Sequence, residues 1–372
     1  MSTISLRSRK VMAGFGLVDL TISLALGLVI ILGVTTLFAD SSRALTDITR
    51  AGRQVENSLY AMDVLAKEIA LVGYWGEANS PVDADDPAYG VLRESEVVDL
   101  ETTPLPELPP LCVGTGATGF DPLVELGWAM EYPMLSGSGQ SFNDRRDRGE
   151  CDSAAEPVSA MSQFLAVRRA STCATSLGSI ATASRCRELD DFFYLQTNGC
   201  FDENAGLSGG EVRLSRVDSA SAGTKLNYLA YGCDAARLAP IYRYVSRIYY
   251  VSERDELVRS DLDLAAAGLM AYKEEIVAEG IEDLQFEWFI DDTGDGEYDR
   301  VERVLAHDDV NNTVGVRIWL MVRSLASVSG YADSNIYSVA GQDWQVPPEK
   351  TAYPRTLQSR MVSLPNVLGR RL

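Results

Sequence analysis

An apolar run from Phe15 to Phe38, in which Asp19 is the only charged residue, constrains this chain more than any other feature. About 24 helical residues rise roughly 36 Å, which is enough to cross a bilayer core of about 30 Å. The residues before the run include Arg7, Arg9 and Lys10 and no acid, and basic flanks favour the cytoplasmic side. The pattern therefore predicts a single membrane-spanning helix, with the rest of the chain outside the cytoplasm.

The junction before this run resembles the class III signal of type IV prepilins. The shared features are the basic leader, Gly14 followed by Phe15, and Leu17-Val18-Asp19-Leu20, where the family usually has a Leu-Ile-Glu-Leu-like sequence. The resemblance implies that prepilin peptidase cleaves between Gly14 and Phe15, removing residues 1–14, and that Phe15 is then N-methylated. It also implies a role for Asp19 in assembly, beside the α-amino group of Phe15. Asp19 is one methylene shorter than the usual Glu. The alternative is a simple single-pass anchor with a stray acid.

A second apolar pattern continues beyond the membrane segment. Apolar residues follow alternating three- and four-residue steps, with small residues in the remaining slots, and no proline interrupts residues 15–72. The stripe consists of Leu45, Ile48, Gly52, Val55, Leu59, Met62, Ala66 and Ile69. We expect one helix from 15 to about 72, in which 15–38 spans the membrane and 39–72 is an amphipathic continuation that packs on a globular head.

Two further regions are similar to the PilW family of type IV pilus minor pilins. The first covers residues 57–76, and the second includes Gly280 to Glu287, Asp291 to Arg300 and Val314 to Ser324. The resemblance implies an α+β, type IV pilin-like fold, with the long N-terminal helix packed on a mainly antiparallel β-sheet head with disulfide-closed loops. Residues 77–160 match no family that we can name.

The head, residues 73–372, shows short β-type runs instead of helical periodicity, which favours an antiparallel sheet. These runs are Phe164–Arg168, Phe192–Gln196, Val212–Leu214, Ile241–Val251, Leu284–Ile290 and Val314–Val322. Residues 252–256 are typical of a hairpin connection. Residues 76–160 contain many prolines, acids and glycines, so we expect 77–160 to be a variable, loop-rich insertion that adds little to the core.

Six cysteines all follow the membrane segment and form no C-x-x-C pair, which favours disulfides over zinc. They are Cys112, Cys151, Cys173, Cys186, Cys200 and Cys233. Fifteen pairings are possible for six cysteines. Spacing alone does not choose among them, although we favour sequential pairing.

Residues 291–302 resemble the calcium-binding loop of an EF-hand, although the flank before them is typical of a strand. The oxygen ligands would be Asp291, Thr293, Asp295, the Glu297 carbonyl, Asp299 and Glu302. Gly296 would supply the sharp turn. The alternative is a hairpin whose carboxylates cap turns. Calcium is thus a candidate cofactor with a structural or regulatory role.

Charge and composition argue against two function classes. The net charge is −20, and loss of the three leader cations would make it −23, which disfavours nucleic-acid binding. The chain has one histidine, His307. Ser208 lies in a G-x-S-x-G sequence, but the residues before it are polar instead of a buried strand, so we interpret the sequence as a turn. We expect no enzyme activity and no catalytic residues.

The predicted function is a non-enzymatic minor pilin that takes part in assembly and initiation of the type IV pilus, near its tip. Before assembly it would lie in the inner membrane with a periplasmic head, and afterwards in the pilus (fimbrium) at the cell surface. The resemblance implies other minor pilins, the major pilin, prepilin peptidase and a tip-associated adhesin as partners. Alternatives are a J-type pseudopilin of type II secretion and a membrane-anchored calcium-binding module.

Overall fold

The computed structural model describes residues 16–76, 109–151, 157–175, 191–202, 207–208, 212–218, 225–265 and 269–368. Gly14, Phe15 and Cys186 lie outside the described residues. The chain divides into two compact units, Met1–Arg53 and Gln54–Leu372.

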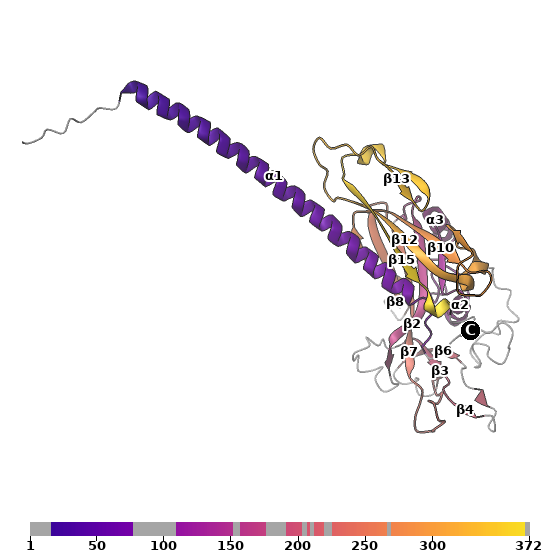
Figure 1. The fold of residues 1–372 in the computed structure, drawn as a ribbon. Coiled ribbons are helices and arrows are strands. Elements are labelled where there is room, and N and C mark those ends of the chain that lie inside the picture. The colour runs from indigo at the N-terminus through magenta and orange to yellow at the C-terminus, as the bar shows by residue number, and fades with distance from the viewer. Residues whose placement is uncertain are drawn as a thin grey trace, which may run out of the picture. The chain divides into compact units, whose positions relative to one another are not determined.

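One helix, α1, spans Leu17–Ala70, close to the predicted range of 15–72. It contains no proline, and the chain leaves the helical conformation at Gly73, whose φ of 71° favours glycine. Among the described residues, α1 alone is long and apolar enough to cross a membrane. It appears in Figure 1 as the indigo ribbon.

The larger unit contains a seven-stranded antiparallel sheet (Figure 1). Five strands follow the order β1-β2-β7-β3-β6, while β8 pairs with β7 and β9 pairs with β8. The bounds are β1 Met134–Ser138, β2 Gln163–Thr175, β3 Phe192–Thr197, β6 Val212–Val217, β7 Ile241–Val251, β8 Glu256–Leu264 and β9 Met270–Glu279. The predicted hairpin connection at 252–256 joins β7 to β8.

A second antiparallel sheet has the order β11-β10-β12-β15. Its strands are β10 Ile281–Ile290, β11 Arg300–Glu302, β12 Thr313–Arg323 and β15 Arg355–Ser363. Two small hairpins pair β13 Ile336–Val339 with β14 Gln342–Gln345, and β4 Phe201–Asp202 with β5 Leu207–Ser208. Short helical turns are η4 His307–Asn312, η5 Pro348–Lys350 and α5 Pro365–Leu368.

The last turns of α1 share one hydrophobic core with both sheets. Buried α1 side chains such as Leu65 and Ile69 cluster with Phe286 on β10 and Ile318 on β12. Strand β10 is buried along nearly its whole length, as expected of a strand covered on both faces, whereas β12 alternates between buried and half-buried residues over part of its length. A long helix packed on antiparallel sheets is the α+β architecture that the sequence predicts.

Residues 109–151 differ from the prediction of a loop-rich insertion at 77–160. They form α2 Pro122–Glu131, β1 and α3 Gly139–Asp147, and Leu111, Val113 and Leu126 are buried in a core on the other face of the seven-stranded sheet. The prediction is therefore wrong for this part. Helix α2 is buried along Val124–Met130, so it lacks the polar face that would reveal a helical period in the sequence.

Candidate assembly surfaces

The N-terminal part of α1 presents an apolar surface of large side chains, each 53–81% exposed. These residues are Leu17, Val18, Leu20, Ile22, Leu24, Leu26, Leu28, Val29, Ile30, Ile31, Leu32, Val34, Leu37 and Phe38. An apolar surface of this extent on a soluble helix would be an aggregation hazard, so it calls for lipid or protein around it. We call these residues the apolar helix surface.

Four hydroxyl groups within this run donate hydrogen bonds to carbonyls of the same helix. Thr21 Oγ1 donates to Val18 O at 2.9 Å, and Ser23 Oγ donates to Asp19 O at 2.7 Å. The hydroxyls of Thr35 and Thr36 do the same further along α1. Because these polar groups are satisfied internally, they add little cost in an apolar environment.

Asp19 lies in the first turn of α1. Its Oδ2 accepts the Gly16 backbone N–H at 3.3 Å. A carboxylate here satisfies a backbone donor that lacks a helical partner and interacts favourably with the positive end of the helix dipole. The predicted contact with the α-amino group of Phe15 involves a residue outside the described part of the chain.

In the larger unit, one face of α1 is docked on the second sheet. Gln54 is buried, and its Nε2 donates to Val322 O at 2.8 Å and to Thr356 Oγ1 at 3.2 Å. The predicted apolar stripe is only partly correct, because Val55 and Leu59 are 46% and 57% exposed. The buried face is instead formed by Gln54, Ser58, Ala61, Met62, Leu65, Ala66, Glu68 and Ile69.

Glu68, in the last turn of α1, holds the helix to the seven-stranded sheet through charge. Its Oε1 lies 3.1 Å from Arg169 Nη2 and also contacts Arg247 Nη1. Arg247 Nε in turn lies 2.6 Å from Asp261 Oδ1. Both members of the Glu68–Arg169 pair are buried, so each charge depends on the other for solvation.

A second buried network lies around Glu282, at the start of β10. Arg355 Nε on β15 lies 2.6 Å from Glu282 Oε2, and Arg355 Nη1 lies 3.3 Å from Asp333 Oδ2. Nearby, Asp255 accepts from Arg323 at 2.9 Å and from Lys350 at 2.6 Å. These contacts join segments up to 95 residues apart, and no local sequence pattern indicates them.

Arg168 of β2 holds residues 109–133 through backbone carbonyls instead of a carboxylate. It is fully buried and donates to Tyr132 O at 2.9 Å and to Pro110 O at 3.1 Å. Burial lowers the pKa of this guanidinium. Glu125 is also buried and accepts the Gly114 N–H at 2.9 Å, and burial raises the pKa of its carboxyl.

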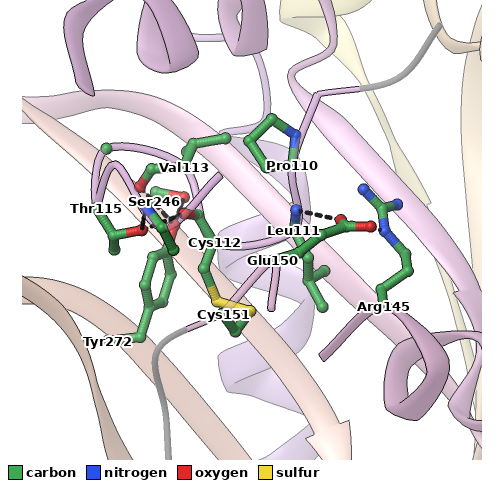
Figure 2. The surroundings of a disulfide bond; sticks show 12 residues. Pro110, Leu111, Cys112, Val113, Thr115, Arg145, Glu150, Cys151, Ser246 and Tyr272 are labelled. Atoms are coloured by element: carbon green, nitrogen blue, oxygen red, sulfur yellow. Dashed lines mark hydrogen bonds and ion pairs between the residues drawn. A yellow bond between two sulfur atoms is a disulfide. The ribbon is translucent and has the colours of Figure 1, made fainter. Parts of the chain in front are cut away.

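Two disulfides join cysteines that are neighbours in sequence order, which agrees with the sequential pairing favoured above. They are Cys112–Cys151 and Cys200–Cys233. Cys173 is also disulfide-bonded, and Cys186 lies outside the described residues. Beside the first disulfide, Glu150 accepts the Leu111 N–H at 3.2 Å and pairs with Arg145 at 2.6 Å (Figure 2). This cluster fixes α3 to the segment at 109–113.

The loop that resembles a calcium site lies between β10 and β11, and its carboxylates bond backbone amides. Asp291 is buried and accepts the N–H groups of Gly294 and Gly296, the latter at 3.0 Å. Asp299 Oδ2 accepts from Asp292 and Thr293.

The remaining predicted ligands of this loop do not converge on one point. The Asp295 side chain accepts the Glu297 N–H, and Glu302 pairs with Arg300 at 3.3 Å. Within the described residues, no group of three or more acidic, histidine or cysteine side chains is arranged to hold a metal ion. The arrangement is that of a hydrogen-bonded turn, and calcium binding stays a prediction.

The residues considered for an enzyme lie in separate elements. His307 begins η4, and its Nε2 lies 2.8 Å from Asp308 Oδ1. Ser208 ends β5, which pairs with β4.

Comparison with known proteins agrees with the sequence motifs. Residues 248–366 match the family model of type IV pilus-assembly protein W (PilW). This range contains the motifs at 280–287, 291–300 and 314–324, so the resemblance to the PilW family is confirmed there. No curated protein matches the chain.

Among solved structures, the chain is similar to a type IV-like pilin from Thermus thermophilus, with 14% sequence identity and a TM-score of 0.21. The similarity covers 33% of this chain and 66% of that pilin, just under two thirds of its length.

Proposed function

We propose that this chain is a minor pilin that takes part in assembly of the type IV pilus and has no enzymatic role. The observation that carries the proposal is the apolar helix surface, because it belongs to a helix whose other end is docked in a folded head. The family match over 248–366 supports the pilus as the destination. A head that is anchored to such a helix can be stored in a membrane and then built into a helical bundle.

The physical mechanism is exchange of one apolar environment for another. In the inner membrane the apolar helix surface contacts lipid, and in the filament the same side chains contact helices of neighbouring subunits. Lipid tails and aliphatic side chains are similarly apolar, so the exchange is driven by close packing and not by a hydrophobic free energy. The PilW-like head then selects which subunits lie next to each other.

Processing and partners follow from the prepilin-like start. We propose cleavage between Gly14 and Phe15 by prepilin peptidase, methylation of Phe15, and neutralisation of its amino group by Asp19 of an adjacent subunit. The partners would be other minor pilins and the major pilin, with a tip-associated adhesin beyond them. The head would be periplasmic before assembly and at the cell surface afterwards.

The decisive experiment is to purify the protein from membranes and sheared pili of its own host and to determine its mature N-terminus by mass spectrometry. A strain without prepilin peptidase is the control. A methylated Phe15 that depends on the peptidase, found in both fractions, supports the proposal. An intact Met1, or a start beyond Phe38, contradicts it and favours an anchored or secreted module.

A J-type pseudopilin of type II secretion would share the same start. The two roles differ in where the processed protein goes. Recovery in pili and loss of pili on gene deletion support the minor pilin, whereas loss of protein secretion with normal pili supports the pseudopilin.

A further inference from the structure

A groove lies along one edge of the seven-stranded sheet. Its volume is about 460 Å³, within the range of pockets that bind ligands. Four consecutive β1 residues, Leu135–Ser138, form one side. Helix α3 contributes Arg145, its C-cap residue is Arg148, and the segment between β11 and β12 contributes Val304 and Leu305. The groove thus follows a strand and has a wall on either side of it.

The β1 edge leaves backbone groups without a strand partner. In the described residues, β1 pairs only with β2. Arg168 N–H donates to Pro133 O and Gly139 N–H donates to Ser162 O, each at 2.7 Å. The register places Ser136 opposite Leu165. Continued to the ends of the strand, it places Pro133 directly opposite Arg168 and Gly139 directly opposite Ser162, so both bonds join directly opposed residues.

In an antiparallel ladder, directly opposed pairs alternate between bonded and non-bonded. Odd-numbered residues of β1 therefore bond to β2, and the N–H and C=O of Ser136 point away from it. Ser136 lines the groove, and no protein group in the described part of the chain bonds these two atoms. An edge of this kind is a template for another strand.

The groove walls are partly apolar and are balanced in charge. Val304 is 70% exposed and supplies the exposed apolar side chain, whereas Phe164, Leu305 and Val310 line the groove as buried core residues. On the α3 side, the two arginines are matched by Asp144 and by Glu150, which pairs with both of them. The walls therefore carry no excess of either charge, so they complement an uncharged segment better than a charged one.

We propose that the β1 edge receives an extended, uncharged segment of a neighbouring pilus subunit, which pairs with Ser136 as an added strand and places apolar side chains against Val304. Backbone hydrogen bonds would supply affinity, and the walls would select the side chains, as in other cases of strand addition. The inference rests on the proposed function, because the neighbouring subunit is met in the filament.

The first test maps the neighbour. A photoreactive amino acid in place of Val304 is cross-linked in native pili, and the linked peptides are sequenced. Leu269, 68% exposed and just before β9, is the matched control position, because β2, β7 and β8 separate β1 from β9. We expect links from position 304 to one segment of another subunit. Links only to this chain's own residues, such as 77–108, would overturn the proposal.

The second test measures whether the Ser136 amide becomes hydrogen-bonded in pili. Hydrogen exchange of the Ser136 amide is compared between the full chain in detergent and assembled pili, and we expect exchange at least about tenfold slower in pili. Val304→Glu should reduce incorporation into pili by at least about tenfold, while Leu269→Glu leaves it unchanged. Because both side chains are exposed, folding of the head is expected to survive either change.

The outcomes separate this inference from the proposed function. If wild-type protein is incorporated but the Ser136 amide exchanges equally fast in both states, strand addition is wrong and the minor-pilin role stands. If wild-type protein never enters pili, the proposed function fails and the inference fails with it.

Discussion

The carboxylate of Glu68 and the guanidinium of Arg169 are buried against each other, with Arg169 Nη2 3.1 Å from Glu68 Oε1, although 101 residues separate them in the sequence. This pair connects the end of α1 to β2. In the proposed filament, this connection would carry force between α1 and the head.

Replacing Glu68 should therefore destabilise the head strongly. Glu68→Gln leaves the buried Arg169 without its counter-charge, and loss of one member of a buried ion pair costs about 3 kcal/mol or more in the free energy of unfolding. The control is Asp63→Asn, which breaks the exposed pairs with Lys67 and Arg360 and should cost less than about 1 kcal/mol. Urea unfolding of the purified protein measures both. Equal, small effects would show that the pair contributes little.

Asp283 should make stability depend on pH. Burial raises the pKa of its carboxyl to about 6, against an ordinary value near 3.8, while hydrogen bonds from Gln285 and Ser162 act in the opposite direction. The folded state thus binds a proton that the unfolded state has lost. Stability is highest below about pH 4 with respect to this group, falls as pH rises to about 6, and stays lower above it.

Asp283→Asn should remove this dependence, because an amide keeps an acceptor for Ser162 and does not ionise in this range. We expect the variant to resist urea better than wild type at pH 8, by up to about 3 kcal/mol, and to match it near pH 4. Unfolding curves between pH 4 and 8 measure the difference. Parallel curves for the two proteins would contradict the buried, raised-pKa state.

Asp19 should matter for assembly and not for cleavage. Asp19→Ala removes the carboxylate proposed to neutralise the amino group of Phe15 in an adjacent subunit. We expect normal removal of residues 1–14 by mass spectrometry but a lower amount of the protein in sheared pili. Asp19→Glu, which restores the carboxylate, should restore incorporation. Equal incorporation of Asp19→Ala and wild type would eliminate this role.

Two variants in the Asp291–Glu302 loop would distinguish a hydrogen-bonded turn from a calcium site. Asp291 bonds two backbone amides, so Asp291→Asn should lower the melting temperature with or without calcium. Asp295 bonds only the Glu297 amide in this loop, so Asp295→Asn should have little effect on a turn. A melting temperature that rises with millimolar calcium in wild type, and no longer does so in Asp295→Asn, would establish the cation site.

The elements with a single strong pattern were predictable from the sequence. Strand β7 has the predicted bounds, Ile241–Val251, because a long run of β-branched and aromatic residues fits one conformation. Helix α1 was predictable because apolar residues repeat at helical spacing without proline. Strand β15 was not, since its edge position leaves most side chains exposed and its composition mixed. Helix α2 was not predicted for the opposite reason, because it is buried on nearly all sides.

The candidate surfaces also differ in whether the sequence reveals them. The apolar helix surface is visible in the sequence because it is continuous. The β1 edge is not, because its groove combines Ser136, Arg148 and Val304, which only the fold brings together. The same holds for the Glu68–Arg169 pair, whose partners have no local relationship.

Four hydroxyl groups of α1 donate hydrogen bonds to carbonyls of the same helix, so these contacts do not depend on what surrounds the helix. They belong to Thr21, Ser23, Thr35 and Thr36. If a subunit leaves the bilayer as proposed, these hydroxyl donors keep the acceptors that they already have within the helix. Extension and retraction of a filament would then leave the hydrogen bonds of these four hydroxyl groups unchanged. The direction of movement would be set by packing between subunits and by the machinery that drives extension and retraction.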